Sequence, residues 1–172
     1  MALHDDLLEQ AKHLAGREPK KPRQASLRRA VSAAYYALFH LLVSEASRKL
    51  ASSQPPQLRL QIRRAFVHGD MKSACEFFTG SSIVDPNSPA NLLHLIALPL
   101  EPDLRRIAAR FVELQQARHT ADYDHLSPFS RANTLLKISQ TEQAFLDWTA
   151  VWDRPNTKVF LTALEFHNRS RR

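Results

Sequence analysis

The segment from residue 24 to residue 51 constrains the fold more than any other part of the chain. It contains neither glycine nor proline and is rich in residues that favour helices. Its residues recur at helical spacing on two sides: Leu27, Val31, Ala34, Leu38 and Leu41 on one, and Ser32, Tyr36, Phe39 and Val43 on another. A helix that is apolar on more than one side must be covered by neighbours on each. The sequence therefore predicts a long central helix surrounded by other helices.

The same periodicity predicts helices along the rest of the chain, and glycines and prolines separate them. The predicted ranges are 3–15, 57–68, 70–78, 91–98, 102–124, 131–152 and 156–167. No segment shows the sustained alternation of a strand, and three glycines are too few for a turn-rich β protein. We therefore predict an all-α protein, an antiparallel helical bundle with a core of four to five helices and short extra helices. Residues 1–168 are expected to form a single domain, and residues 169–172 a basic tail.

Charge and composition indicate the kind of partner and the compartment. The 172 residues carry a net charge of +7, which favours encounters with polyanions, nucleic acid above all, although a charge of this size also serves solubility. No window approaches the length of apolar sequence that spans a membrane, and the acidic, polar N-terminus does not resemble a signal peptide. The single cysteine, Cys75, cannot form an internal disulfide. These features predict a cytoplasmic protein without a membrane segment.

Catalytic or binding chemistry is best sought at the end of the predicted helix over 102–124. The buried stripe of that helix is defined by Ile107, Phe111 and Leu114. At about 100° per residue, Arg118 and His125 continue this stripe, and Asp122 lies four residues after Arg118. A charge on an apolar stripe needs a partner, a cleft or another subunit. One interpretation is therefore a functional site, and the other is an ordinary ion pair between Arg118 and Asp122 where the stripe leaves the core.

Two segments resemble the HEPN domain family. The sequence LRRAVSAAYYALFH, over 27–40, is similar to the second helix of HEPN domains, and QQARHTADYD, over 115–124, is similar to the family through its Arg-x-x-Ala-Asp-Tyr core. The segment 66–72 between them is also similar. The resemblance covers about residues 5–150 and belongs to the Ala-Asp-Tyr variety of the family.

This resemblance implies a helical bundle that pairs into a homodimer and acts on RNA as a metal-independent ribonuclease. Many members resemble ribonucleases, often toxins encoded beside a nucleotidyltransferase antitoxin. The residues of this chain that match the family's catalytic pattern are Arg118, His119 and His125, and the other motif or binding positions are Asp122, Tyr123, Arg28 and Arg29. An Arg fork would neutralise charge growing on a phosphate, and a His would move a proton of the ribose 2′-hydroxyl or of the leaving oxygen. Neither a metal nor a cofactor is expected.

A second hypothesis also stays open, because the catalytic His is often missing from the Ala-Asp-Tyr variety. The chain would then be a non-catalytic module that binds a nucleotide, RNA or a nucleotidyltransferase partner. In that case Arg118 and Asp122 form a structural pair, and Tyr123 is a contact residue.

A further arginine and histidine, Arg63 and His68, also stand five residues apart. Since His68 directly precedes Gly69, the simpler interpretation is an imidazole at the C-terminal end of a helix, where the helix dipole favours a positive charge.

Overall fold

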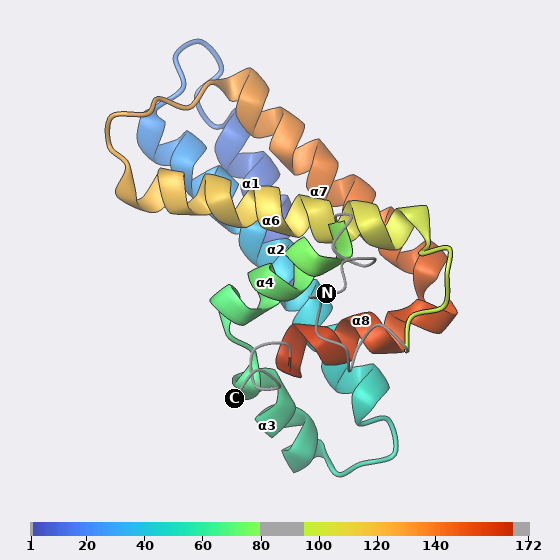
Figure 1. Cartoon of the computed structure of the whole chain (residues 1–172). Helices are drawn as coiled ribbons and strands as arrows, with labels where there is room; N and C mark the ends of the chain where they lie inside the picture. The colour runs from blue at the N-terminus through green and yellow to red at the C-terminus, as the bar shows by residue number, and fades with distance from the viewer. Residues whose placement is uncertain (1, 80–94, 167–172) are drawn as a thin grey trace. The chain divides into compact units, whose positions relative to one another are not determined.

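The computed structural model of the chain describes residues 2–79 and 95–166, and helices account for most of them (Figure 1). They are α1 (Leu3–Gly16), α2 (Gln24–Leu50), α3 (Pro56–Ala65), α4 (His68–Thr79), α6 (Pro102–Tyr123), α7 (Arg131–Val151) and α8 (Pro155–Phe166). No strand occurs within these two ranges. The predicted all-α helical bundle is therefore confirmed. Within the same ranges no helix is long and apolar enough to cross a membrane, as predicted.

The predicted break at Gly69 is wrong. Phe66 has an extended backbone (φ −71°, ψ 126°), so α3 ends at Ala65 and α4 already begins at His68. Phe66 is buried, whereas no residue of α3 is. The helix α3 thus ends directly before Phe66, whose ring is buried in the core, and Gly69 is part of the first turn of α4. His68 consequently lies at the N-terminal end of a helix, where the dipole does not favour a positive charge.

Two predicted segments fall partly or wholly outside the described residues. For the short helix predicted over 91–98, residues 91–94 lie outside them, and residues 95–98 are not helical. The predicted basic tail, residues 169–172, also lies outside them.

The chain divides into two compact units. Unit 1 comprises Met1–Leu41 and Arg110–Leu146, and unit 2 comprises Leu42–Ala109 and Asp147–Arg172. Three helices, α2, α6 and α7, contribute residues to both units. The single domain expected over residues 1–168 stays a prediction.

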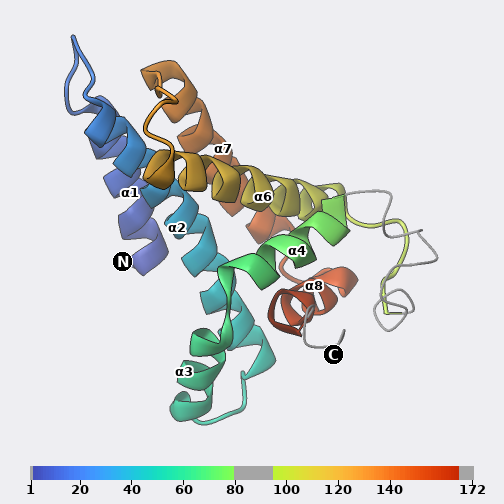
Figure 2. The ribbon, with the colours of Figure 1, turned by 60° about the vertical axis from the view of Figure 1, so that its left-hand side comes forward.

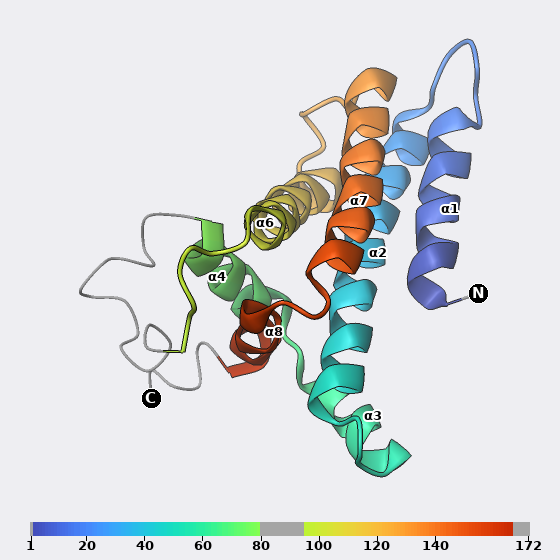
Figure 3. The same cartoon turned by 90° about the vertical axis from the view of Figure 1, so that its right-hand side faces the viewer.

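Unit 1 is built around the first part of α2. Figure 3 shows α1 and α7 running alongside this part of α2. The Lys12 ammonium of α1 lies 2.8 Å from the Glu142 carboxylate of α7, and the rings of His4 and Phe145 also meet. Most residues of α2 predicted to be covered are buried on both of its faces, Leu27, Val31, Ala34 and Leu38 on one and Ser32 and Phe39 on the other, whereas Tyr36 is partly exposed. This confirms the prediction of a central helix within unit 1.

Unit 2 has a core between α4 and α8, which lie side by side in Figures 1 and 2. The rings of Phe78 and Phe160 pack edge to face at 5.1 Å, and both side chains are fully buried. Cys75 is buried in the same unit as a free thiol, and its burial raises the pKa of the thiol well above its ordinary value. This cysteine therefore acts as a small apolar core residue.

Candidate functional site

The buried stripe of α6 in unit 1 becomes charged at Arg118. Phe111 and Leu114 are buried, and Arg118, the next member of the stripe, has a side chain that is only 20% exposed. The side chain of Asp122, one turn further along, is 21% exposed. The structure thus places a cation and a carboxylate in a largely buried position, as the periodicity predicted.

Both groups have partners that link α6 to α2. The Arg118 Nε lies 2.8 Å from the Asp122 Oδ2 in an ion pair, and Arg118 Nη2 donates a hydrogen bond of 3.1 Å to the Tyr36 hydroxyl. The second carboxylate oxygen, Oδ1, accepts a 2.8 Å hydrogen bond from the Ser32 hydroxyl. We call Ser32, Tyr36, Arg118 and Asp122 the Arg118 cluster. The ion pair and the two hydrogen bonds join a partly buried cation to a partly buried anion and fasten α6 to the central helix.

The surroundings of Arg118 stabilise its positive charge. Burial opposes the charge, but the Tyr36 hydroxyl and the Asp122 carboxylate outweigh it, so the pKa of Arg118 is raised. The guanidinium carbon also lies 5.6–6.0 Å from the ring centroids of Tyr35, Tyr36 and Tyr123, within the range of cation–π attraction. Arg118 is therefore a permanent cation whose charge is already balanced by a carboxylate.

The two candidate histidines occupy different positions. His119 is exposed on α6, and its ring lies 5.0 Å from that of Tyr123, which is itself 63% exposed. His125 follows the last residue of α6 by two positions and lies exposed in the turn after the helix. Among the described residues, no hydrogen bond, ion pair or ring contact joins His125 to Arg118. The structure thus gathers Arg118, Asp122, Tyr123 and His119 at the end of α6 and leaves His125 beyond them.

The turn that carries His125 has a defined geometry. The Asp124 carboxylate accepts hydrogen bonds from the hydroxyl of Ser127 and, at 2.9 Å, from the backbone N–H of Leu126. These two donors lower the pKa of Asp124, because they stabilise its ionised form. The turn is thus closed by its own side chain, an Asx-type arrangement that holds His125 at the surface.

Arg28 has a structural environment that the sequence did not reveal. Its guanidinium donates hydrogen bonds to the backbone carbonyls of Thr120, Ala121, Asp124 and Ser127, at 2.8–3.3 Å. These carbonyls belong to the last turn of α6 and the turn after it, where carbonyls lack partners within the helix. Arg28 therefore caps the C-terminal end of α6, with the favourable sign for the helix dipole. The neighbouring Arg29 is exposed.

Replacing Arg28 with alanine is expected to lower the free energy of unfolding by about 2 kcal/mol, since hydrogen bonds from a charged donor contribute about 1.5–3 kcal/mol. Arg29→Ala is the matched control, because it removes the same side chain at an exposed neighbour and is expected to change stability by less than about 0.5 kcal/mol. Urea denaturation followed by circular dichroism measures both. Equal effects of the two substitutions would show that Arg28 does not cap α6.

The sequence placed Ser32 and Tyr36 on a covered face of α2 but did not predict their bonds to the Arg118 cluster. A serine and a tyrosine among apolar residues were the only available signal. As to metals, no group of three His, Cys, Asp or Glu side chains able to hold an ion occurs within residues 2–79 and 95–166.

No protein family model, no curated protein and no solved structure matches this chain. The resemblance to HEPN domains therefore rests on the residues quoted above, chiefly those over 27–40 and 115–124.

Proposed function

We propose that this chain is a HEPN-like helical module that binds RNA without cleaving it. The observation that carries this proposal is the ion pair between Arg118 and Asp122, with 2.8 Å between the two charged groups. Of the two hypotheses that the sequence left open, this ion pair favours the non-catalytic binding module, in which Arg118 and Asp122 form a structural pair.

A catalytic arginine must aim its donors at the charge that develops on the phosphate. Two of the donor nitrogens of Arg118, Nε and Nη2, already face Asp122 and Tyr36. A phosphate that approaches Arg118 would therefore meet an ion pair whose net charge is zero, and the attraction between the phosphate and this pair would be weak. The proton-transfer partner that the resemblance suggests, His125, lies beyond the helix end.

RNA is the partner that the overall charge favours. The chain has 24 Lys and Arg residues against 17 Asp and Glu residues, which gives the net charge of +7. Contacts of Lys and Arg with phosphates supply most of the affinity of such proteins for nucleic acid and make it depend on salt. The proposed module would use this attraction and would not need the Arg118 cluster as a catalyst.

The proposal predicts that the protein binds a fluorescein-labelled single-stranded RNA in the presence of EDTA, with an affinity that falls as salt rises, and leaves the RNA intact. Arg118→Met is expected to change the dissociation constant by less than about threefold, because the Nε and Nη2 donors of Arg118 already face Asp122 and Tyr36 and the proposal gives them no phosphate contact. It is also expected to lower the free energy of unfolding by about 1 kcal/mol, since one ion pair and one hydrogen bond are lost. Fluorescence anisotropy, a denaturing gel and urea denaturation give the three readouts.

Each part of the proposal can fail separately. If the wild-type protein does not bind the RNA even at low salt, the binding function is wrong. If the RNA is cut by the wild type and left intact by a folded Arg118→Met variant, the chain is an enzyme and the non-catalytic interpretation is wrong.

The second candidate is the metal-independent ribonuclease, a homodimer that serves as a toxin beside a nucleotidyltransferase antitoxin. It is favoured by the exposed pair His119 and Tyr123 beside Arg118 at the end of α6. This candidate expects cleavage that persists in EDTA, and a large loss of cleavage in His119→Ala or His125→Ala. It also expects a mass twice that of the monomer in light scattering.

A further inference from the structure

The chain has two strongly basic segments of equal net charge, residues 19–44 and a segment of unit 2. Residues 46–69 contain no Asp or Glu. Their cationic residues are Arg48, Lys49, Arg59, Arg63 and Arg64, so this segment has a net charge of +5. It comprises the last turn of α2, the connection that follows, α3, and the residues up to the first two of α4. We call residues 46–69 the basic segment.

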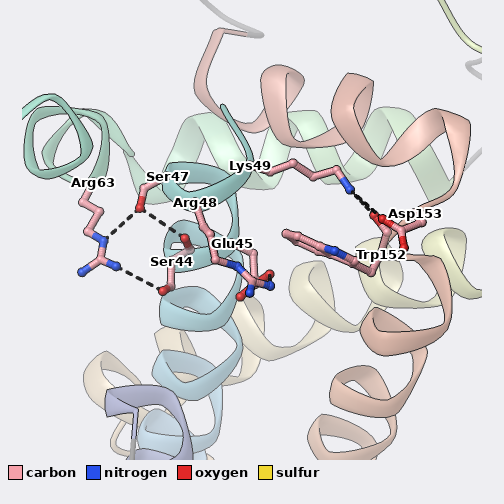
Figure 4. Close-up of polar contacts among 8 residues, drawn as sticks. All are labelled: Ser44, Glu45, Ser47, Arg48, Lys49, Arg63, Trp152 and Asp153. Carbon is pink, nitrogen blue, oxygen red and sulfur yellow. Dashed lines mark hydrogen bonds and ion pairs between the residues drawn. The ribbon is translucent and has the colours of Figure 1, made fainter. Parts of the chain in front are cut away.

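The two cations of the basic segment that lie on α2 are compensated. Arg48 forms an ion pair with Glu45 at 2.6 Å, and Lys49 lies 3.7 Å from the Asp153 carboxylate. Both also lie over the indole of Trp152, at 4.2 and 4.0 Å from its centroid (Figure 4). These two side chains therefore belong to the packing between α2 and the residues that follow α7 in unit 2.

The partners of Arg59 and Arg63 in α3 are neutral. Arg63 donates from Nε to the Ser47 hydroxyl at 3.0 Å and from Nη2 to the Ser44 hydroxyl at 3.3 Å (Figure 4). Arg59 donates to the backbone carbonyl of Gln54 at 3.4 Å. Over residues 2–79 and 95–166, no carboxylate forms an ion pair with Arg59, Arg63 or Arg64. Three positive charges on one helix are thus left without a compensating charge.

Arg63 and Arg118 differ in whether a neighbouring group neutralises their positive charge. Two hydroxyls orient its guanidinium without neutralising it, whereas a carboxylate neutralises Arg118. An oriented guanidinium loses less side-chain entropy when it binds a phosphate, and its Nη1 is not used by the two serines. Arg63 is therefore preorganised to bind an anion from outside the chain.

α3 is accessible along its length. None of its ten residues is buried, and Arg63 and Arg64 are exposed. Arg59 and Arg63 are four residues apart, about 6 Å along the helix axis, and so lie on adjacent turns of one side. Arg64 follows at about 100° around the helix. Such an arrangement offers several phosphate contacts to one strand.

The exposed apolar residues of α3 argue against a membrane surface as its partner. Leu58 is 43% exposed, but Ile62 and Ala65, which share its side of the helix, are partly buried. Leu60 is 48% exposed and lies about 200° away from Leu58, on the side of the arginines. A helix that lies on a membrane collects its apolar residues on one face, opposite a charged face. The charges of α3 thus fit a polyanion that does not require an apolar face.

From these observations we propose that α3, with its arginines Arg59, Arg63 and Arg64, is the RNA-docking surface of the chain. This inference rests on the proposed RNA binding and adds where the strand binds. The contacts would be to phosphates, so they would position an RNA strand without reading its sequence. The Arg118 cluster in unit 1 would not take part.

The test compares two triple variants that remove equal charge. The first is Arg59→Gln, Arg63→Gln and Arg64→Gln in α3, and the control is Lys20→Gln, Lys21→Gln and Arg23→Gln, three exposed residues between α1 and α2. With single-stranded RNA of mixed sequence, the α3 variant is expected to bind at least about tenfold more weakly at low salt. Its slope of log affinity against log salt is expected to fall by about 2, since each phosphate contact to a single strand contributes about 0.7. The control is expected to change affinity by less than about threefold.

The outcomes separate this inference from the proposed function. If the wild type does not bind RNA, both are wrong. If it binds and the α3 variant binds as well as the control, or if both variants lose affinity equally, only the location in α3 is wrong. Wild-type binding to phosphatidylserine vesicles that the α3 substitutions abolish, with RNA binding unchanged, would also overturn it and assign α3 to membranes. Circular dichroism checks that both variants fold, which we expect because five of the six residues are exposed and the sixth, Arg59, is only partly buried.

Discussion

Replacing Arg106 with methionine is expected to lower the free energy of unfolding by about 3 kcal/mol, because it removes the cation that is paired with a buried carboxylate. Arg106 donates two hydrogen bonds to Asp147 in unit 2, from Nε to Oδ2 at 3.1 Å and from Nη2 to Oδ1 at 3.0 Å. The Asp147 side chain is 4% exposed. The hydrogen bond to Asp147 is the main reason that the pKa of Arg106 is raised. Methionine fills much of the space of the arginine stem but leaves the carboxylate without its cation.

The same geometry predicts that replacing Asp147 lowers the free energy of unfolding by less than replacing Arg106. Asp147→Asn removes the buried negative charge itself, and Arg106, whose side chain is about half exposed, can turn to water and to Asp103. Its cost is therefore expected to be about 1 kcal/mol. Combining Arg106→Met with Asp147→Leu should recover most of the loss, since an apolar pair can replace a buried ion pair.

Arg105→Met is the control for this series, because Arg105 is exposed and adjacent on α6. It is expected to change stability by less than about 0.5 kcal/mol. Guanidinium chloride denaturation followed by circular dichroism measures all four variants. A loss below about 1 kcal/mol in Arg106→Met, or an equal loss in Arg105→Met, would contradict the role assigned to the buried pair.

The helices that could be predicted from the sequence are those whose ends and faces are encoded locally. The prediction for α2 needed only the absence of glycine and proline and the recurrence of apolar residues, and it was correct to within one residue at its C-terminal end. The predicted start of α7 at residue 131 was also correct, and Ser130 directly before it accepts a 3.1 Å hydrogen bond from the Asn133 N–H as an N-cap. In both cases the deciding contacts lie within a few residues of one another.

The boundary between α3 and α4 could not be predicted in this way, because a tertiary contact decides it. Local signals favoured Gly69 as the break, yet neither described glycine has a positive φ. The chain turns at Phe66, whose ring is buried although the helix before it has no buried residue. Burial of a single ring is not visible in the periodicity of a short, largely exposed helix.

The candidate site was predictable along one helix and not between helices. The spacing of Arg118 and Asp122 gave their ion pair as one of two interpretations, since residues four apart on a helix are neighbours. The hydrogen bond to Tyr36 joins residues 82 positions apart, and the cap formed by Arg28 joins residues more than 90 apart. Those partners depend on how α2 packs against α6 within unit 1, so the sequence alone could not choose between a catalytic and a structural arginine.

Replacing Phe111 with alanine is expected to lower the free energy of unfolding by about 4 kcal/mol. Phe111 is fully buried in unit 1, and its ring lies 5.6 Å from that of Tyr35, which is also fully buried. Removing a buried phenylalanine ring loses its burial and leaves a cavity, which together cost about 3–5 kcal/mol. Tyr123→Ala on the same helix is the control. Because Tyr123 is 63% exposed, its replacement should cost at most about 1 kcal/mol, and an equal loss would contradict the assignment of Phe111 to the core.

The Phe111→Ala variant also tests whether residues 1–168 unfold as one domain. The chain has two tryptophans, Trp148 and Trp152, and both belong to unit 2, whereas Phe111 belongs to unit 1. Tryptophan fluorescence therefore reports the unfolding of unit 2, while circular dichroism reports the helices of both. If the chain is one cooperative domain, the substitution must lower the denaturation midpoint equally by both probes, because coincident transitions are the mark of two-state unfolding. A fluorescence midpoint that stays at its wild-type value, beside a circular dichroism transition that begins earlier, would show that the two units unfold independently and that the single-domain prediction is wrong.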